Sequence, residues 1–416
     1  MSGFLEKAQS RLGSFGGLPH RNHPLWKGFP LQKWEKVLDA ALEEREAAVP
    51  SPSPRGSVSK ETFDFSLLPF SVEDFSVLLF RGEEVLWLKD RPSVMEARLN
   101  TEKRSLFSDP DSFAELSLAL AHPGLFLKME AEAVLEKPLL CLLDASLESG
   151  WESLVHFVEM GARSKAAVVF YSLQNQGSPT PLRTHFVSGE LKDSSVLTTA
   201  LVSGTSFVSK QFHRFDFFQK KDSRLEVIDL GKGIGFGRGE YHVELLERGA
   251  SAQVSGIHLL NDHQIYDTRV RISHAAPETY SRQNFKCVVS GSAQSLYGGS
   301  VIIQKDAQKS DSSQSHKALL VAPAAKASAF PELEVHADDV KATHGSSTGQ
   351  MNPEEIFYLK SRALSQGEAV HLLSEAFVKD VVLKISDAGL RLLMESLLEQ
   401  ALPDFVRVME SRWRTP

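Results

Sequence analysis

The strongest constraint on the fold is a succession of short β-branched segments that fills the middle of the chain. From about Lys137 to His336 the sequence consists mainly of such runs: AAVVFY, SVLTTALV, RLEVIDL, YHVELL, AQVSGIHLL, TRVRISH, FKCVVSG and GGSVIIQ. Most runs are set off by Ser, Gly, Asn or Asp, which is typical of strands separated by tight turns. This pattern is compatible with a sandwich, a barrel or a parallel β-helix.

The turns between the runs mildly favour stacked strands over hairpins. No Asn-Gly or Asp-Gly pair occurs in the chain, so the strongest signal for a two-residue hairpin is missing. The glycine-rich segment GKGIGFGRGE, residues 231–240, could suggest a phosphate-binding loop. We expect a flexible β-turn there instead, because the next segment reads as strand rather than helix.

The N-terminal part is expected to be helical up to about Ala48 and mixed after that, with the strand-like runs FSVLLF and EVLWLK. A Pro/Ser-rich linker, VPSPSPRGS, lies near residues 49–58, and SDPDSFAELSLALAHPG predicts a short helix that begins at Asp111 or Ser112 and ends at Pro123-Gly124. Before the linker, one apolar helix face is formed by Leu31, Trp34, Leu38 and Leu42.

The C-terminal part predicts three helices with clear boundaries. Asn352 is expected to cap the first, with Pro353 at its first position and Glu355 as the capping-box acid. Ser365 and Glu368 form a second capping box, and a third helix starts near Ser386 or Asp387 and is stopped or kinked by Pro403. Two apolar stripes are expected, Leu372, Leu373, Ala376 and Phe377 on one helix and Leu390, Leu393, Met394, Leu397, Leu398 and Ala401 on the next.

Composition excludes several classes of protein. A chain of 416 residues, 42% hydrophobic and 24% charged, is long and apolar enough for two or three cores. A net charge of -7 argues against a nucleic-acid binder. Cys141 and Cys287 cannot form a disulfide framework, and no secretory signal or long apolar span is present. We therefore expect a cytoplasmic protein without a membrane partner.

Two constellations invite a chemical interpretation. His344 lies among small polar residues at the joint between the strand-rich and helical parts, where it is either an ordinary loop residue or a functional one. Asp267, Arg269 and Arg271 would share one strand face, as in β-helical polysaccharide lyases. For these three residues we favour a solvated face with cross-strand ion pairs.

The joint also resembles a known family. The segment PELEVHADDVKATHGSSTGQMNPEEIFYLKSRALSQGEAVHLLSEAFVKDVV is similar to the C-terminal signature of the SufB/SufD family, subunits of the SufBCD iron-sulfur cluster assembly complex. SHAAPETYSRQNFK from Ser273 and GLPHRNHPLWKGFPL near the N-terminus resemble further family segments. The stretch SDSSQSHKALLV from Ser310 lacks the cysteine of SufB subunits, so the SufD branch matches better.

This resemblance implies a mainly β fold, a right-handed parallel β-helix flanked by helical N-terminal and C-terminal domains. We expect a helical or mixed domain over residues 1–136, the β-helix over 137–343 and a helical domain over 344–416. The implied function is a non-catalytic scaffold. It would pair with a SufB-like subunit through the end of the β-helix, dock a SufC-like ATPase on the C-terminal helices and form homodimers when isolated.

The resemblance also implies the site residues. The interface histidine of the family falls on His344, a candidate ligand shared with the partner, while Phe357, Tyr358, Arg362 and Phe377 would contact partners. Ala342 stands where some relatives have a cysteine. Because one histidine cannot hold a cluster alone, we expect no tightly bound cofactor in the isolated chain and only a transient iron-sulfur cluster or iron at the interface. A carbohydrate-active β-helix and a purely structural β-helix remain alternatives.

Overall fold

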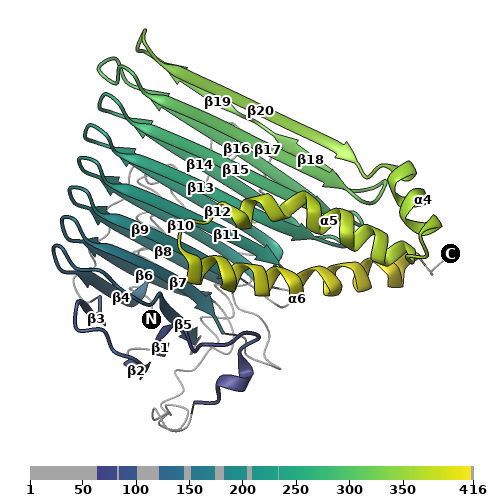
Figure 1. Cartoon of the computed structure of the whole chain (residues 1–416), viewed down its shortest axis with the longest axis horizontal. Helices are drawn as coiled ribbons and strands as arrows, with labels where there is room; N and C mark the ends of the chain where they lie inside the picture. The colour runs from purple at the N-terminus through teal and green to yellow at the C-terminus, as the bar shows by residue number, and fades with distance from the viewer. Residues whose placement is uncertain are drawn as a thin grey trace, which may run out of the picture.

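The computed structural model describes residues 63–81, 84–100, 121–144, 151–173, 182–203, 209–232 and 234–413. These residues form a β-solenoid of about 7 turns with three C-terminal helices (Figure 1). Two sheets made mainly of parallel strands face each other, and from β4 to β17 successive strands of the chain enter the two sheets in alternation. The predicted parallel β-helix is therefore confirmed.

The first sheet has the strand order β2-β1-β5-β7-β9-β11-β13-β15-β17-β20. All its pairings are parallel except that of β1 with β2. Its strands are β1 (Ser76–Arg81), β2 (Glu84–Lys89), β5 (Leu139–Asp144), β7 (Lys165–Ser172), β9 (Val196–Ser203), β11 (Arg224–Lys232), β13 (Ser251–Leu260), β15 (Tyr280–Val289), β17 (Asp311–Leu320) and β20 (Lys341–Gln350).

The second sheet has the order β18-β16-β14-β12-β10-β8-β6-β4-β3, and β19 also pairs with β16. Only β3 and β4 are antiparallel. Its strands are β3 (Met95–Leu99), β4 (His122–Met129), β6 (Trp151–Met160), β8 (Leu182–Leu191), β10 (Ser209–Gln219), β12 (Ile234–Leu245), β14 (Ile265–His274), β16 (Gln294–Ile303), β18 (Lys326–Ala329) and β19 (Glu332–Val335).

A column of residues with positive φ turns the chain from the second sheet into the first. It consists of Glu132, Arg163, Ser194, Asp222, Gly249, Glu278 and Lys309. A left-handed conformation costs a non-glycine residue about 1–2 kcal/mol. Hydrogen bonds to the next turn offset this cost: Ser194 N donates to Lys221 O over 2.8 Å, and Asp222 N donates to Arg248 O over 3.0 Å.

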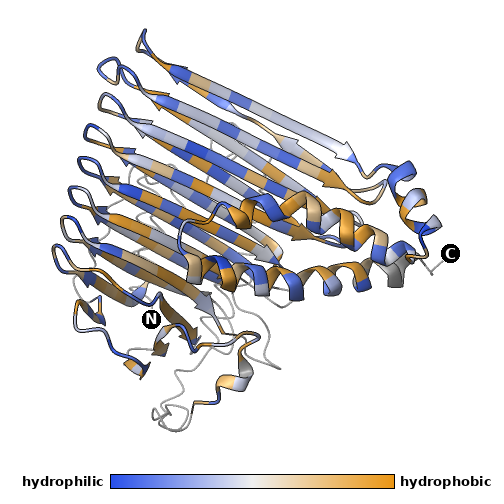
Figure 2. Ribbon diagram, in the orientation of Figure 1, coloured by the Kyte–Doolittle hydropathy of each residue, from blue (hydrophilic) through white to orange (hydrophobic). Residues whose placement is uncertain are grey.

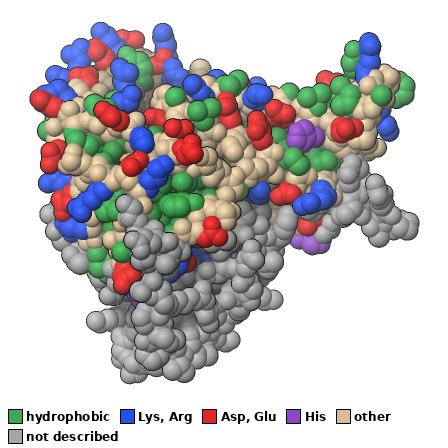
Figure 3. All heavy atoms as spheres, turned by 60° about the horizontal axis from the view of Figure 1, so that its bottom comes forward, with side chains coloured by type: hydrophobic (Ala, Val, Ile, Leu, Met, Phe, Trp, Pro, Cys, Tyr) green, Lys and Arg blue, Asp and Glu red, His purple; other side chains and the backbone are tan. Residues whose placement is uncertain are grey.

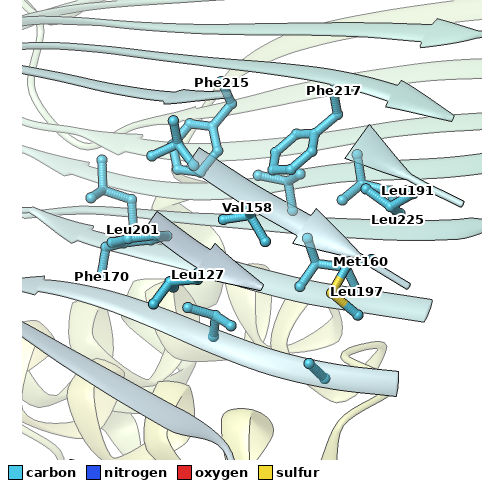
Figure 4. Close-up of a cluster of buried hydrophobic side chains, with 14 of the residues drawn as sticks. Leu127, Val158, Met160, Phe170, Leu191, Leu197, Leu201, Phe215, Phe217 and Leu225 are labelled. Atoms are coloured by element: carbon cyan, nitrogen blue, oxygen red, sulfur yellow. The ribbon is translucent and has the colours of Figure 1, made fainter. Parts of the chain in front are cut away.

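The main core fills the space between the two sheets (Figure 4). Alternate side chains of each strand point inward, as the period of two requires. On β10, for example, Phe215 and Phe217 are buried in this core, where their rings stack 6.1 Å apart. We call this side of each sheet its inner face and the opposite side its outer face.

Glycines on the inner face make room for rings, which explains a wrong prediction. Residues 231–232 and 234–240 belong to strands β11 and β12 rather than to a flexible turn. A Cβ at Gly239 would lie 2.5 Å from His213 Nε2, and one at Gly237 would lie 3.0 Å from Tyr266 Cδ2. The glycines therefore reflect close side-chain packing inside the β-helix and not a mobile loop.

Three helices follow the β-helix: α4 (Pro353–Ser361), α5 (Gln366–Leu383) and α6 (Ala388–Trp413). Asn352 caps α4, and the capping box of Ser365 with Glu368 is confirmed. Asp387 accepts the N–H of Leu390 at the start of α6. Helices α5 and α6 cover the outer face of the first sheet, where their apolar residues meet those of its strands (Figures 1 and 2).

The predicted stripe of α6 is buried as expected, but that of α5 is wrong in part, since only Leu373 and Phe377 pack against the core. Leu372 is 44% exposed, Ala376 is exposed, and Leu373 and Phe377 are half-buried. The sheet instead receives Val370, Val378, Val381 and Val382. Pro403 lies inside α6, which continues to Trp413, so it does not stop the helix.

Several predictions concern residues that the structure does not describe. The helix over residues 31–42, the linker near 49–58 and the short helix near 111 lie outside the described residues. Pro123 and Gly124, expected to end that helix, belong to β4. The described part of residues 1–136 contains the 3-10 helix η2 (Phe65–Leu67) and strands β1 to β4. The predicted boundary at 344 falls inside β20.

Candidate functional site

The site begins with β20, the last strand of the first sheet. His344 lies in this strand, so the loop predicted there is wrong. The ladder continues from Lys341 N, which donates to Ser310 O over 2.9 Å, to Met351 N, which donates to Leu320 O over 2.9 Å. Pairing with β17 thus holds a run of Ala, Gly, Ser and Thr in extended conformation despite its loop-like composition.

One side of β20 is a free edge. Among the described strands, β20 pairs only with β17. Because Lys341 and Met351 donate toward β17, alternation directs the backbone groups of His344, Ser346 and Thr348 to the opposite side. A Cβ at Gly345 or Gly349 would meet no atom within 4 Å. All residues of β20 are exposed except the half-buried Ala342, so this edge is accessible.

His344 shares the inner face with buried residues of the preceding turn. It is in register with Gln314, and Ser346 is in register with His316. Gln314 and His316 are buried, whereas His344 and Ser346 are exposed because they lie on the last strand. His316 Nδ1 lies 3.4 Å from Ser346 Oγ. The imidazole of His344 therefore belongs to the open end of the β-helix interior.

The thiol of Cys287 and the imidazole of His316 lie inside the β-helix next to this open end, and both are uncharged. Cys287 Sγ is 3.8 Å from His316 Nε2, and the His316 ring stacks on Tyr297 with centroids 4.7 Å apart. Burial raises the pKa of Cys287 to about 12 and lowers the pKa of His316 to about 4. At neutral pH Cys287 is therefore a packed thiol, as predicted, and not a thiolate ligand.

The predicted partner-binding residues lie on α4, after α4 and on α5. Phe357 and Tyr358 are 75% and 57% exposed, and no residue of α4 is buried. The Arg362 guanidinium lies 5.4 Å from the Tyr358 ring centroid. Phe377 differs from these, because it is half-buried and its ring contacts Lys286 at 4.8 Å.

Asp267, Arg269 and Arg271 share the outer face of the second sheet, as predicted, but this face is not solvated. Asp267 is fully buried and Arg269 is 5% exposed. Asp267 accepts hydrogen bonds from Arg238 Nη1 at 2.6 Å and Arg269 Nε at 2.8 Å. Buried, paired charges do not line an open groove for a polysaccharide, and these residues are not part of the His344 site.

Three further observations limit the chemistry. Within the described ranges, no group of three or more His, Cys, Asp and Glu residues could hold a metal ion. None of the helices seen in those ranges has the length and apolarity needed to cross a membrane. In the coloured part of Figure 3, basic and acidic side chains are interspersed, so this part of the surface lacks the single-sign field of a nucleic-acid site.

Sequence reasoning missed that β20 is an edge strand and that Ser346 contacts His316 of the preceding turn. A weak signal was present, since Thr343, Gly345 and Ser347 alternate with His344 and Ser346 as two faces of a strand would. Nothing in the sequence alone placed His316 one turn below Ser346, because that contact depends on the register of β17 with β20.

Comparison with known proteins identifies the family. The family described as SUF system FeS cluster assembly, SufBD core domain, matches residues 148–377. The iron-sulfur cluster assembly protein SufD of Escherichia coli (strain K12) is 24% identical over 94% of this chain and 91% of its own length.

Two further relatives match over shorter regions. An iron-sulfur cluster assembly SufBD family protein of Synechocystis is 31% identical over 42% of this chain and 38% of its own length. Protein ABCI7, chloroplastic, of Arabidopsis thaliana is 28% identical over 42% of this chain and 37% of its own length. The chain thus matches less than half the length of these two relatives. It belongs to the SufBD family of iron-sulfur cluster assembly proteins and is most like SufD.

Proposed function

We propose that this chain is a non-catalytic scaffold subunit that pairs with a SufB-like subunit through β20 and docks a SufC-like ATPase on its C-terminal helices. Family membership gives a role in iron-sulfur cluster assembly. The observation that supports the pairing best is the free edge of β20. Both cysteines are buried and form no disulfide, which is consistent with the reducing cytoplasm, the compartment that we propose.

An exposed edge strand of this length needs a partner. Natural sheets protect their edges with short strands, prolines or charged side chains. The second sheet ends in two strands of 4 residues each, β18 and β19, whereas β20 has 10 residues, no proline and Lys341 as its one Lys, Arg, Asp or Glu. A strand from a second subunit would satisfy the outward backbone groups of β20 and continue the sheet.

The pairing can be tested by removing one outward N–H. Thr348→Pro deletes a donor on the free edge without breaking the ladder to β17, because prolines are tolerated at the outer side of an edge strand. Thr348→Ala is the matched control, since it shortens the side chain and keeps the N–H. We expect the proline variant to lose co-purification with the SufB-like subunit and the alanine variant to retain it. Equal recovery of the partner by both variants would contradict pairing through this edge.

The same edge would allow the isolated chain to form homodimers. Two copies could pair their β20 strands in the absence of the SufB-like subunit. Size-exclusion chromatography with light scattering should then give a dimer that dissociates in Thr348→Pro and when the partner is added. A dimer that persists in both cases would place its interface elsewhere.

Helix α4 and its neighbours supply the proposed ATPase site. Exposed aromatic side chains such as Phe357 and Tyr358, close to an arginine, are typical of binding hot spots. Replacing both by Ala should weaken ATPase binding by about tenfold or more, the effect of losing at least 1.4 kcal/mol. The melting temperature should not change, because both side chains face solvent. Val134→Ala, another exposed apolar position at 54%, is the control.

His344 is proposed to bind the cargo of the complex, iron or a nascent cluster, together with ligands from the partner. Clusters are held mainly by thiolates, so a single imidazole can only complete a shared site. His344→Ala should leave the complex assembled and change its stability by about 0.5 kcal/mol or less, as expected for an exposed residue. The iron and sulfide recovered after anaerobic purification should fall sharply. Cys141→Ser and Cys287→Ser should lose little of either, and loss confined to a cysteine variant would contradict this assignment.

The alternatives have less support. A carbohydrate-active β-helix is disfavoured because Asp267 and Arg269 are buried in ion pairs. A structural β-helix without a metal role would be favoured by a buried, hydrogen-bonded His344, but this residue is exposed.

A further inference from the structure

A hollow lies on the outer face of the first sheet, beside the C-terminal end of α5. Its volume is about 250 Å³. Strands β13, β15 and β17 form its floor, and α5 with its C-cap forms one wall. All of its lining residues are polar or charged: Gln253, Arg282, Gln283, Asn284, Lys286, Ser313, Ser315, Lys317, Asp380 and Lys384. The hydrogen-bonding and charged groups of these side chains therefore surround the space.

Positive charge exceeds negative charge around this hollow. Four of its residues are basic, and Asp380 is its one carboxylate. That carboxylate is already shared, since Lys286 Nζ lies 2.7 Å and Lys384 Nζ 3.5 Å from its oxygens. Partial burial acts to raise the pKa of Asp380, but the two lysines outweigh this effect and lower it. Asp380 is therefore ionised, and its charge is shared between these two lysines.

The two other basic residues of the hollow, Arg282 and Lys317, differ in whether a carboxylate neutralises them. Arg282 Nη1 pairs with Asp311 at 2.9 Å, outside the lining. Lys317 has no ion-pair partner among the residues that the structure describes. Counting Asp380 and Asp311 against the four basic residues leaves two positive charges in excess.

The strand register holds Lys286 and Lys317 next to each other. Lys286 and Lys317 are in register on the parallel strands β15 and β17, so their side chains leave the same face about 4.8 Å apart. Lys286 cannot turn away, because it is 8% exposed, donates to Phe377 O over 2.6 Å and forms an ion pair with Asp380. Like charges directly opposite each other destabilise a sheet. A bound anion would relieve this repulsion.

We propose that this hollow binds a small anion of the phosphate class. Its volume is below the range of about 300–1,000 Å³ typical of drug-sized ligands, so a free phosphate or one terminal phosphate group fits the available space. Ser313, Ser315 and Asn284 offer neutral donors beside the lysines. This site does not depend on pairing with other subunits, so it stands or falls separately from the proposed function.

Isothermal titration calorimetry on the isolated full chain tests the site, with inorganic phosphate as the probe. Lys317→Gln should weaken binding by about tenfold or more, the scale of one charge-assisted hydrogen bond. Lys317→Arg, which keeps the charge, should bind nearly as well as the wild type. Lys326→Gln removes an exposed lysine from β18 of the other sheet and is the matched control.

AMP, added in competition, distinguishes a phosphate ester from the free ion. Displacement of phosphate by AMP would assign the site to the phosphate end of a larger ligand, and no displacement would assign it to the free ion. The proposal is overturned if the wild type gives no binding heat with phosphate. It is also overturned if Lys317→Gln binds as tightly as the wild type, or if Lys326→Gln loses affinity equally, which would indicate general charge screening.

Discussion

Gly256→Ala should destabilise the β-helix although it adds a single methyl group. Gly256 lies on the inner face of β13, in register with Phe285 of β15. A Cβ at this position would be 2.5 Å from Phe285 Cε1 and 2.7 Å from Cδ1. Carbon atoms in contact are about 3.5–4.0 Å apart, so the ring would have to move by about 1 Å.

The ring has little room for this movement. Tyr297 lies 5.5 Å, His258 6.0 Å and Tyr241 6.2 Å from it, measured between ring centroids. Overpacking of this kind costs about 1–3 kcal/mol. Urea unfolding followed by circular dichroism should therefore show a lower midpoint for Gly256→Ala with an unchanged m-value.

A double-mutant cycle with Phe285→Leu isolates the contact. Leu removes the ring edge that meets the new methyl group, so the double variant should be more stable than the sum of the single effects predicts. A coupling of about 0.5–3 kcal/mol is expected for residues in direct contact. If the two effects add within about 0.5 kcal/mol, the clash with Phe285 is not the cause of the destabilisation.

Two further predictions concern buried polar groups. Burial lowers the pKa of His274 to about 4, so the folded state binds fewer protons than the unfolded state, and this contribution to stability is complete above pH 6.5 and lost as the pH falls toward 4. His274→Gln should therefore reduce the loss of unfolding free energy between pH 7 and pH 5 by about 2 kcal/mol in urea titrations, and an unchanged pH profile would contradict this. Glu226 joins the start of α6 to β11, because it accepts hydrogen bonds from Ser386 N at 3.1 Å and from Ser386 Oγ. Glu226→Ala should cost about 1–3 kcal/mol of unfolding free energy and speed amide exchange in α6, whereas the exposed control Glu399→Ala should change stability by about 0.5 kcal/mol or less.

The β-helix was predictable because its strands have a strong local signal. Runs such as AAVVFY in β7 combine high β-propensity with burial, and the family resemblance selected the β-helix among three β folds. The helix caps were also predictable, since Asn352, Ser365 and Glu368 act through neighbours in sequence. Features that depend on residues within one or two turns of backbone could thus be read from the sequence.

The failures concern features that depend on tertiary contacts. The segment with His344 is rich in Gly, Ser and Thr, and only the ladder with β17 makes it a strand. The face of α5 that meets the sheet was only partly identified, because Leu373 and Phe377 lie at its edge while its centre is formed by valines such as Val378 and Val381. The charged residues around Asp267 on the outer face were expected to be solvated, because the sequence does not show how deeply a sheet face is covered.

The stacking of turns has a consequence for the order in which the molecule gains stability. Because each turn contacts mainly the turns beside it, stability is close to a sum of nearest-neighbour terms, and folding spreads along the axis as in a one-dimensional chain. The final strand has a neighbour on one side alone, so β20 is expected to fray before the interior turns and to exchange its amide protons fastest. Binding of a second subunit there would add the missing neighbour. Association would then be the last propagation step of folding. An unassembled copy could be identified by the frayed, rapidly exchanging β20.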